Sequence, residues 1–157
     1  MDNRIVVSRI DDLKPVKKSE YSDFAYTKYE AASRDDFSQV YICFYEIEPG
    51  KAPYPKHSHC FNTESFYIIS GSGTVETGDG KITIKAGDLI TFPPGEAGTH
   101  KIINTSETEK LVYIDFDTSL VPDIIKYPDS GKTGVKQANG NTRYFIDGTD
   151  VDYYTGE

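Results

Sequence analysis

The sequence predicts an all-β fold. From Val40 onward, apolar runs of strand length are cut by Gly and Pro at close intervals, which is typical of a barrel or sandwich of short strands. The 12 Tyr and 8 Phe residues favour strands, and no apolar pattern of helical period competes in this block. A chain of 157 residues has the usual size of one domain and can bury a core of its own.

The expected strands follow one another with short connections. In chain order they are 40–48, 56–60, 64–70, 73–77, 81–85, 88–92, 100–104 and 110–117. Asp79-Gly80 separates two of these runs and suits a tight hairpin, because Gly accepts a positive φ. The run that follows it, KITIK, alternates cleanly, as a half-buried strand does.

The segments on either side of this block have a different character. Residues 1–37 are polar and show no sustained period, so we interpret them as an N-terminal extension to a barrel that spans 38–118. Residues 119–157 return to Pro, Asp, Gly and Asn, with one short strand expected at 142–146. We expect this C-terminal extension to pack on the barrel, with a disordered tip as the alternative.

Charge and composition limit the partners and the location. A net charge of -8 and a pI near 4.9 disfavour a nucleic-acid or anionic-membrane partner, because no basic stripe can neutralise phosphates. No signal peptide or membrane-spanning run is recognisable, which favours the cytoplasm. In that reducing compartment Cys43 and Cys60 are expected to be free thiols, although an even count leaves a bridge open. Exposed sheet edges favour a homodimer.

All three histidines lie inside the strand-rich block. His57 and His59 alternate on one strand and so share a face, although such a pair alone is more often found on a solvated surface. Glu64 begins the next strand, and His100 begins a strand after a Pro/Gly turn. Three imidazoles and a carboxylate together suit Fe, Mn, Ni, Zn or Cu, so the combination predicts a metal site.

Two longer patterns contain these four residues. Gly50, His57-Ser58-His59, Glu64 and Gly71 resemble the first cupin motif. Gly87, Pro93, Gly95, His100 and Asn104 resemble the second, and the two motifs occur in order. One extra residue before His57 and two before His100 depart from the commonest spacing, in turns where insertions are tolerated.

The resemblance implies a cupin double-stranded β-helix, a jelly-roll barrel, with extensions at both ends. It also implies that His57, His59, Glu64 and His100 bind one divalent transition metal, which would be Fe, Mn, Ni or Zn. The stretches PGKAPYPKHSH, FPPGEAGTHKIIN, KYPDSG and RYFIDGTDVDY are similar to a family of small uncharacterised bacterial single-domain cupins. Cupins share a fold and carry many activities, so the reaction stays open at this point.

Other residues near the motifs are candidates for the pocket. We name Tyr54, Phe66, Ile102 and Asn104 as candidate lining residues, and no catalytic residue is assigned. Lys51, Lys56 and Lys101 flank the ligands and could meet an anionic substrate, although solvated lysines are commoner at such places.

The ligand set itself narrows the function. If all three histidines bind metal, none remains as a general base, which disfavours metal-free chemistry based on a free histidine. We therefore expect a metal-dependent enzyme of the isomerase or dioxygenase type acting on a small oxygen-rich molecule. The alternatives are a non-catalytic small-ligand binding or sensing module with a bound metal, and a purely structural metal.

Overall fold

A computed structural model describes residues 5–33, 39–146, 148 and 150–156. Across these ranges the regular structure consists of β-strands and two 3-10 turns, at Ile10–Asp12 (η1) and Glu96–Gly98 (η2). The all-β prediction is thus confirmed. Among the same residues, no helix has the length and hydropathy needed to cross a membrane.

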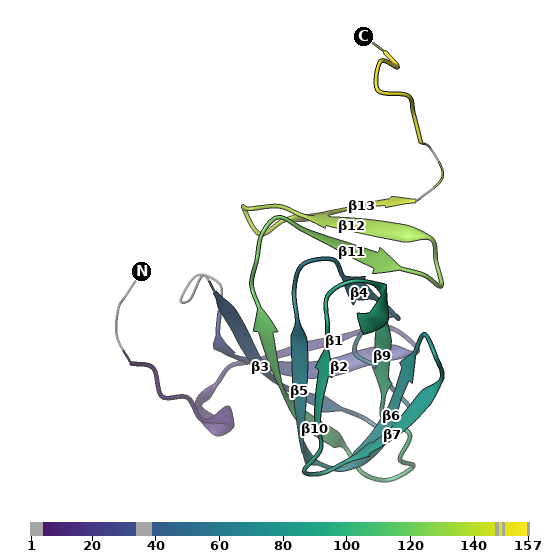
Figure 1. The fold of residues 1–157 in the computed structure, drawn as a ribbon. Coiled ribbons are helices and arrows are strands. Elements are labelled where there is room, and N and C mark those ends of the chain that lie inside the picture. The colour runs from purple at the N-terminus through teal and green to yellow at the C-terminus, as the bar shows by residue number, and fades with distance from the viewer. Residues whose placement is uncertain (1–4, 34–38, 147, 149, 157) are drawn as a thin grey trace.

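One wall of the molecule is a six-stranded antiparallel sheet (Figure 1). Its strands, from one edge to the other, are β1 (Pro15–Tyr21), β2 (Phe24–Ala32), β3 (Val40–Ile47), β10 (Leu111–Thr118), β5 (Glu64–Ser70) and β8 (Leu89–Phe92). Strand β10 lies in the middle and pairs with both β3 and β5. Strands that are far apart in the sequence therefore lie side by side, as in a jelly roll.

Two smaller sheets accompany the main sheet, one as the opposite wall and one over an end of the barrel (Figure 1). One contains β7 (Lys81–Lys85), β6 (Ser72–Thr77) and β9 (His100–Ile103), and the other contains β13 (Thr142–Ile146), β12 (Lys132–Lys136), β11 (Asp123–Tyr127) and β4 (Ser58–His59). A two-residue bridge joins them, because the His57 N–H donates to the His100 carbonyl at 3.0 Å and the His100 N–H donates back at 2.9 Å. Two predicted ligands thus meet at this join.

The core lies between the walls and follows strand alternation. On β10 the inward positions Leu111 and Tyr113 are 0% and 1% exposed, and Cys43, Tyr45 and Ile47 alternate in the same way on β3. This inner surface is apolar toward one end of the barrel and becomes polar toward the other, where Glu64 begins β5. The polar end is where the site is formed.

The region 15–32 departs from the sequence-based expectation. Residues 1–37 showed no period, yet β1 and β2 form a hairpin that extends the main sheet through β2 and β3. Residues 24–29 are all half-buried, so this strand has no strictly buried face that would produce a period-two signal. Residues 1–4 and 34–37 of the expected extension lie outside the described residues.

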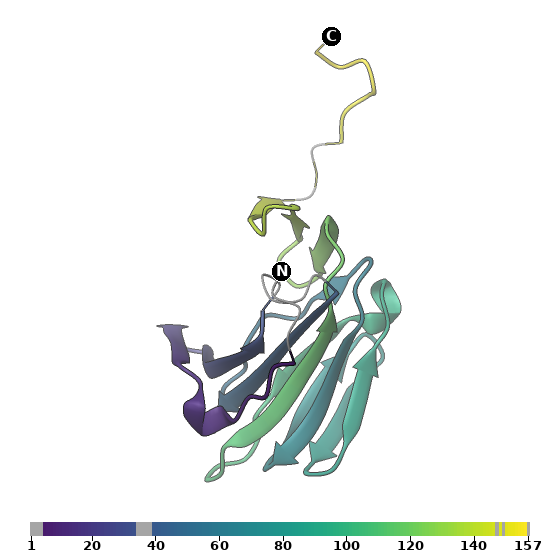
Figure 2. The ribbon, with the colours of Figure 1, turned by 90° about the vertical axis from the view of Figure 1, so that its left-hand side faces the viewer.

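The C-terminal segment contains more structure than the one predicted strand. Strand β13 has the predicted bounds, 142–146, but β11 and β12 precede it and complete a small sheet. Strand β11 pairs with β4 through Ile125 and His59, so this sheet lies over the polar end of the barrel (Figure 1). Turned by 90°, Figure 2 shows strands of the barrel side by side, with residues 150–156 projecting away from them. The homodimer stays a prediction.

Two turns predicted from the sequence are formed as expected. Glu76 pairs with Lys81 across the Asp79-Gly80 turn, which confirms the predicted hairpin. Gly71 has a φ of +79°, and a Cβ there would lie 2.2 Å from the carbonyl oxygen of Lys110. Only glycine allows the turn after β5 to approach the start of β10 so closely.

Candidate metal centre

The ends of three strands, β4, β5 and β9, bring the predicted ligands to one place. His59 ends β4, His57 directly precedes this strand, and His100 faces His57 across the bridge. Glu64 is the first residue of β5 on the opposite wall. Directly opposed residues of antiparallel strands point to the same face, so the imidazoles of His57 and His100 share the inner side.

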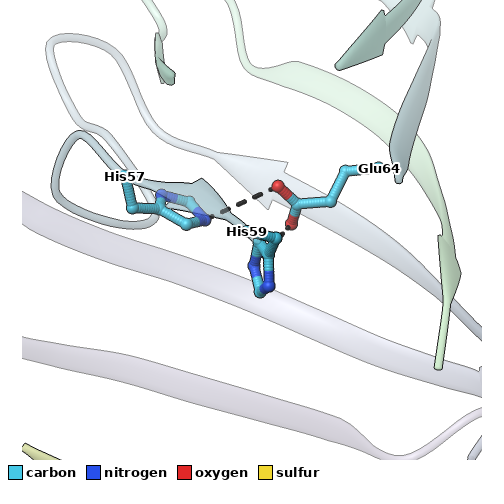
Figure 3. Close-up of side chains that lie close together, drawn as sticks. All are labelled: His57, His59 and Glu64. Atoms are coloured by element: carbon cyan, nitrogen blue, oxygen red, sulfur yellow. Dashed lines mark ion pairs between the residues drawn. The ribbon is translucent and has the colours of Figure 1, made fainter. Parts of the chain in front are cut away.

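The side chains converge on the Glu64 carboxylate. The Nε2 atoms of His57 and His59 lie 3.6 and 3.5 Å from its two oxygens (Figure 3). His100 Nε2 lies 3.4 Å from Glu64 Oε2. One ligand atom from each of His57, His59 and Glu64 lies within 4.8 Å of the others, so these three form a candidate metal site, with His100 beside the carboxylate.

The opposite nitrogen of each imidazole has its own acceptor. Nδ1 of His57 lies 2.9 Å from the Pro55 carbonyl oxygen, and Nδ1 of His100 lies 2.8 Å from that of Gly98. Nδ1 of His59 lies 2.5 Å from Asp123 Oδ2. Because these partners only accept, each Nδ1 carries the proton, and the Nε2 lone pair of a neutral ring faces Glu64.

Burial and charge act in opposite directions on these groups. Burial raises the pKa of Glu64, but the close imidazole of His57, together with those of His100 and His59, outweighs burial and lowers that pKa to about 2. Burial lowers the pKa of His57, but the negative charge of the adjacent Glu64 carboxylate outweighs burial and brings that pKa above the usual value. For His100 burial dominates and lowers the pKa to about 4. The site thus holds an ionised carboxylate that attracts a positive charge.

This arrangement fits a divalent transition metal. Neutral imidazoles presenting Nε2, each held through Nδ1 by a carbonyl or carboxylate, are the usual way histidine binds such ions. The distances of 3.4 to 3.6 Å between the Nε2 atoms and the carboxylate oxygens are longer than typical hydrogen bonds, as expected when both atoms are placed to bind one metal ion. The Phe92 ring stacks on His100 with centroids 3.7 Å apart and fixes that ring further.

Two cavities adjoin the site. The smaller, of about 20 Å³, is lined by Tyr54, His57, Glu64, Phe66, His100, Tyr113 and Asp115, among others. The larger, of about 240 Å³, lies between the barrel and the C-terminal sheet and is lined by Tyr41, Tyr45, Tyr54, His57, His59, Glu64, Asp115, Asp117, Tyr127, Lys136 and Tyr144, among others. The candidate ligands therefore face a space of the size that a small molecule needs.

The predicted lining residues divide into two groups. Tyr54 lines both cavities, and Phe66 and Ile102 line the smaller one. Asn104 is fully buried and lines neither, because its amide donates to the carbonyls of Ile47 and Glu109 and its oxygen accepts from the Ser106 N–H. Asn104 thus fixes the loop between β9 and β10.

The lysines and cysteines named from the sequence are spread around the site. Lys101 lines the smaller cavity, whereas Lys51 donates to the Ser22 carbonyl and Lys56 lines a separate groove on the outer surface. Both cysteines are free thiols, as predicted, and Cys60 lines that outer groove with Lys56.

Sequence reasoning missed Asp123. This residue is fully buried at the start of β11, and besides His59 it accepts hydrogen bonds from the Phe61 and Ile124 N–H groups and the Asn62 amide. Burial raises its pKa, but these donors outweigh that effect and lower it. The one signal in the sequence is a polar residue directly before the apolar pair Ile124-Ile125, far from both motifs.

Residues 43–117 match the family model described as the cupin domain. This range contains both motifs and all four predicted ligands. No curated protein matches the chain.

Solved structures show the same fold. A structure from Acidithiobacillus ferrooxidans, provisionally named a sugar phosphate isomerase, is 28% identical, with 80% of this chain and 81% of that chain covered and a TM-score of 0.68. A cupin from Silicibacter pomeroyi named a sugar phosphate isomerase is 18% identical, with 88% and 91% covered and a TM-score of 0.77. A predicted oxalate decarboxylase from Thermotoga maritima is 22% identical, with 74% and 100% covered and a TM-score of 0.64.

Proposed function

Because the chain belongs to the cupin superfamily, we propose that it is a metal-dependent isomerase that acts on a small sugar phosphate. The observation that carries the proposal is the convergence of the Nε2 atoms of His57, His59 and His100 on the Glu64 carboxylate. The name of the 28% identical structure favours sugar phosphates over other oxygen-rich molecules.

His57, His59, Glu64 and His100 would hold the metal. A bound divalent ion supplies a Lewis acid that polarises a carbonyl oxygen and makes the neighbouring C–H bond more acidic. This is the chemistry that interconversion of an aldose and a ketose needs. It requires a metal that exposes at least one position to the larger cavity, which these ligands also line.

The protein must also move a proton between neighbouring carbons. The three imidazoles are engaged through both nitrogens and are not available for this step. The other titratable groups on the cavity wall are the carboxyls of Asp115 and Asp117, the amine of Lys136 and several phenols. Burial and the negative charge of Asp117 raise the pKa of Asp115 well above its usual range, so this carboxyl holds a proton more readily than an exposed one does.

Positive charge for a phosphate group comes from the C-terminal sheet. Lys132 and Lys136 alternate on β12, and the register places them on the same face as Tyr127 and Tyr144. Lys136 lines the larger cavity, and Lys132 lines an adjoining groove that shares Tyr54 and Tyr144 with it. In a chain with a net charge of -8, this location of two lysines favours an anionic substrate.

The test combines metal analysis with an isomerase assay. The purified protein would be analysed for metal, stripped with a chelator and reloaded separately with Mn²⁺, Fe²⁺, Ni²⁺ and Zn²⁺. Ribose 5-phosphate and glucose 6-phosphate would then be followed by NMR for conversion to their ketoses. We expect conversion that depends on the metal and is lost in Glu64→Gln, while Glu76→Gln, which alters an exposed ion pair with Lys81, retains it.

Two outcomes would contradict the proposal. Conversion that persists in the metal-free protein would exclude the metal-dependent mechanism. A loaded protein that converts neither sugar phosphate nor any other aldose or ketose phosphate would favour the binding or sensing module instead.

A further inference from the structure

Asp115 occupies a position where the fold calls for an apolar side chain. The inward-facing residues of β10 are Leu111, Tyr113 and then Asp115, whose cross-strand neighbours are Cys43 and Phe66. Asp115 is only 5% exposed, and within the described part of the chain its Oδ1 is buried without a hydrogen-bond partner. A buried polar atom without a partner is costly, so a valine or leucine would serve packing better here.

The location of Asp115 relates it to the candidate metal ligands. The two cavities beside the site share four lining residues, which are Tyr54, His57, Glu64 and Asp115. Two of the four are candidate ligands. The Asp115 carboxyl thus faces the same space as these candidate ligands, at the junction between a pocket of about 20 Å³ and a chamber of about 240 Å³.

The surroundings hold the wall of this junction rigid. The Tyr54 and Tyr45 hydroxyls are hydrogen-bonded at 3.0 Å, and the Tyr45 ring stacks on Tyr113 with centroids 5.1 Å apart. Tyr45 and Tyr113 are 2% and 1% exposed. Asp115 is therefore preorganised, and its Oδ1 atom can still form a hydrogen bond to a molecule in the cavity.

We propose that Asp115 is a substrate-binding residue that holds a hydroxyl group of a polyhydroxylated ligand beside the metal ligands. A hydroxyl both donates and accepts, so it satisfies Oδ1 of a carboxyl or a carboxylate, which an apolar ligand cannot do. The inference deepens the proposed function and rests on it for the ligand class. A site that hydrogen-bonds a hydroxyl rejects the analogue that lacks it.

Binding without turnover tests this directly. The probes are ribitol 5-phosphate, which has no carbonyl to isomerise, and its 1-, 2- and 3-deoxy analogues, titrated by calorimetry into the metal-loaded protein. We expect the wild type to prefer the complete polyol over one of the deoxy analogues by about tenfold. Asp115→Val should bind that analogue and the parent equally well, because valine fits the strand and the apolar neighbours but forms no hydrogen bond.

Three controls separate binding from folding. Asp115→Asn has the same shape and should recover part of the discrimination. Asp79→Asn makes the same chemical change in an exposed hairpin turn and should behave as wild type. The melting temperature and metal content of each variant show that it is folded and loaded, and a purely structural role for Asp115 would not change discrimination between probes.

The outcomes for the inference and for the proposed function differ. Equal binding of all four probes by the wild type, or no binding at all, overturns the inference, as does undiminished discrimination in Asp115→Val. If discrimination is found but no aldose is isomerised, the inference stands and the proposed function fails. If isomerisation is found and Asp115→Val has wild-type kinetics and discrimination, the proposed function stands and the inference about Asp115 fails.

Discussion

Asp123 Oδ2 accepts a hydrogen bond from Nδ1 of His59 at 2.5 Å, across 64 residues of sequence. The two residues lie on neighbouring strands, because β11 pairs with β4. Three further donors, from Phe61, Asn62 and Ile124, hold the same carboxylate. The C-terminal sheet therefore fixes the ring orientation of one candidate metal ligand.

The first prediction is that Asp123→Asn weakens metal binding. The asparagine amide can present an N–H group to His59, which would favour the ring form protonated on Nε2 and unable to bind metal. We expect the affinity for Zn²⁺ to fall about 10- to 100-fold, as measured by competition with a chromophoric chelator. Asp79→Asn is the matched control. An unchanged affinity would show that Asp123 serves only the packing of β11 against β4.

The second prediction concerns pH. The pKa of Glu64 is lowered to about 2 and that of His100 to about 4, so neither group takes up a proton near neutrality. His57 has a raised pKa, so a proton on His57 competes with the metal at a higher pH than one on Glu64 or His100. Metal affinity should decrease by about tenfold per pH unit below that pKa, measured with the same chelator from about pH 8 to about pH 6.

The matched variant for this pH dependence is Glu64→Gln. Its uncharged amide no longer favours the imidazolium of His57, so the onset of proton competition should move to lower pH even though overall affinity is weaker. An affinity that does not change over this range in the wild type would contradict the assignment of His57 as a ligand.

The sequence predicted the barrel and the ligands because their signals are local. Short runs separated by turns indicate strands, and His57 and His59 show their shared face by spacing alone. Glu64 and His100 could be added because each begins a strand next to a turn. The convergence of all four residues follows from the jelly-roll topology that the two motifs imply.

The remaining parts of the site depend on pairings that leave no local pattern. Asp123 gains its role only because β11 pairs with β4, and nothing near it in the sequence indicates that register. Asp115 was recognisable as a strand residue, but its inward direction depends on pairing with Cys43 and Phe66. The β1–β2 hairpin was missed because residues 24–29 of β2 are all half-buried and residues 15–19 of β1 are all exposed, so neither strand shows alternation.

The third prediction is that Gly98→Ala damages both the fold and the site. A Cβ at Gly98 would lie 1.9 Å from the Pro93 carbonyl oxygen, so the turn η2 would have to move. The Gly98 carbonyl accepts from Nδ1 of His100 at 2.8 Å, and that bond would move with it. We expect a loss of about 1–3 kcal/mol in the free energy of unfolding, measured with urea, and weaker Zn²⁺ binding.

Gly78→Ala is the control for this substitution. Gly78 lies in the turn between β6 and β7, and a Cβ there would have no atom within 4 Å. Its substitution should change neither stability nor Zn²⁺ binding beyond about 0.5 kcal/mol. Equal effects of the two substitutions would mean that backbone entropy, and not the contact with Pro93, causes the loss in the free energy of unfolding.

The fourth prediction is that Asp115 makes the metal-free protein less stable as the pH rises. Burial and the charge of Asp117 raise the pKa of Asp115 in the folded state, whereas the unfolded chain ionises near the usual value. Between these two pKa values the folded state binds more protons than the unfolded chain does. The contribution of Asp115 to the free energy of unfolding is therefore fully present below the unfolded-state pKa and is lost as the pH rises toward the folded-state pKa.

Asp115→Asn should remove this dependence, since an amide does not ionise. As the pH rises, the free energy of unfolding of Asp115→Asn should increase relative to that of the wild type, by about 1.4 kcal/mol for each pH unit between the two pKa values. The measurement is urea unfolding of the metal-free proteins at about pH 5 and pH 8. Asp79→Asn should keep the wild-type slope. If Asp115→Asn has that slope too, Asp115 ionises normally in the folded protein, and the hydroxyl in the proposed ligand complex would then donate to a carboxylate.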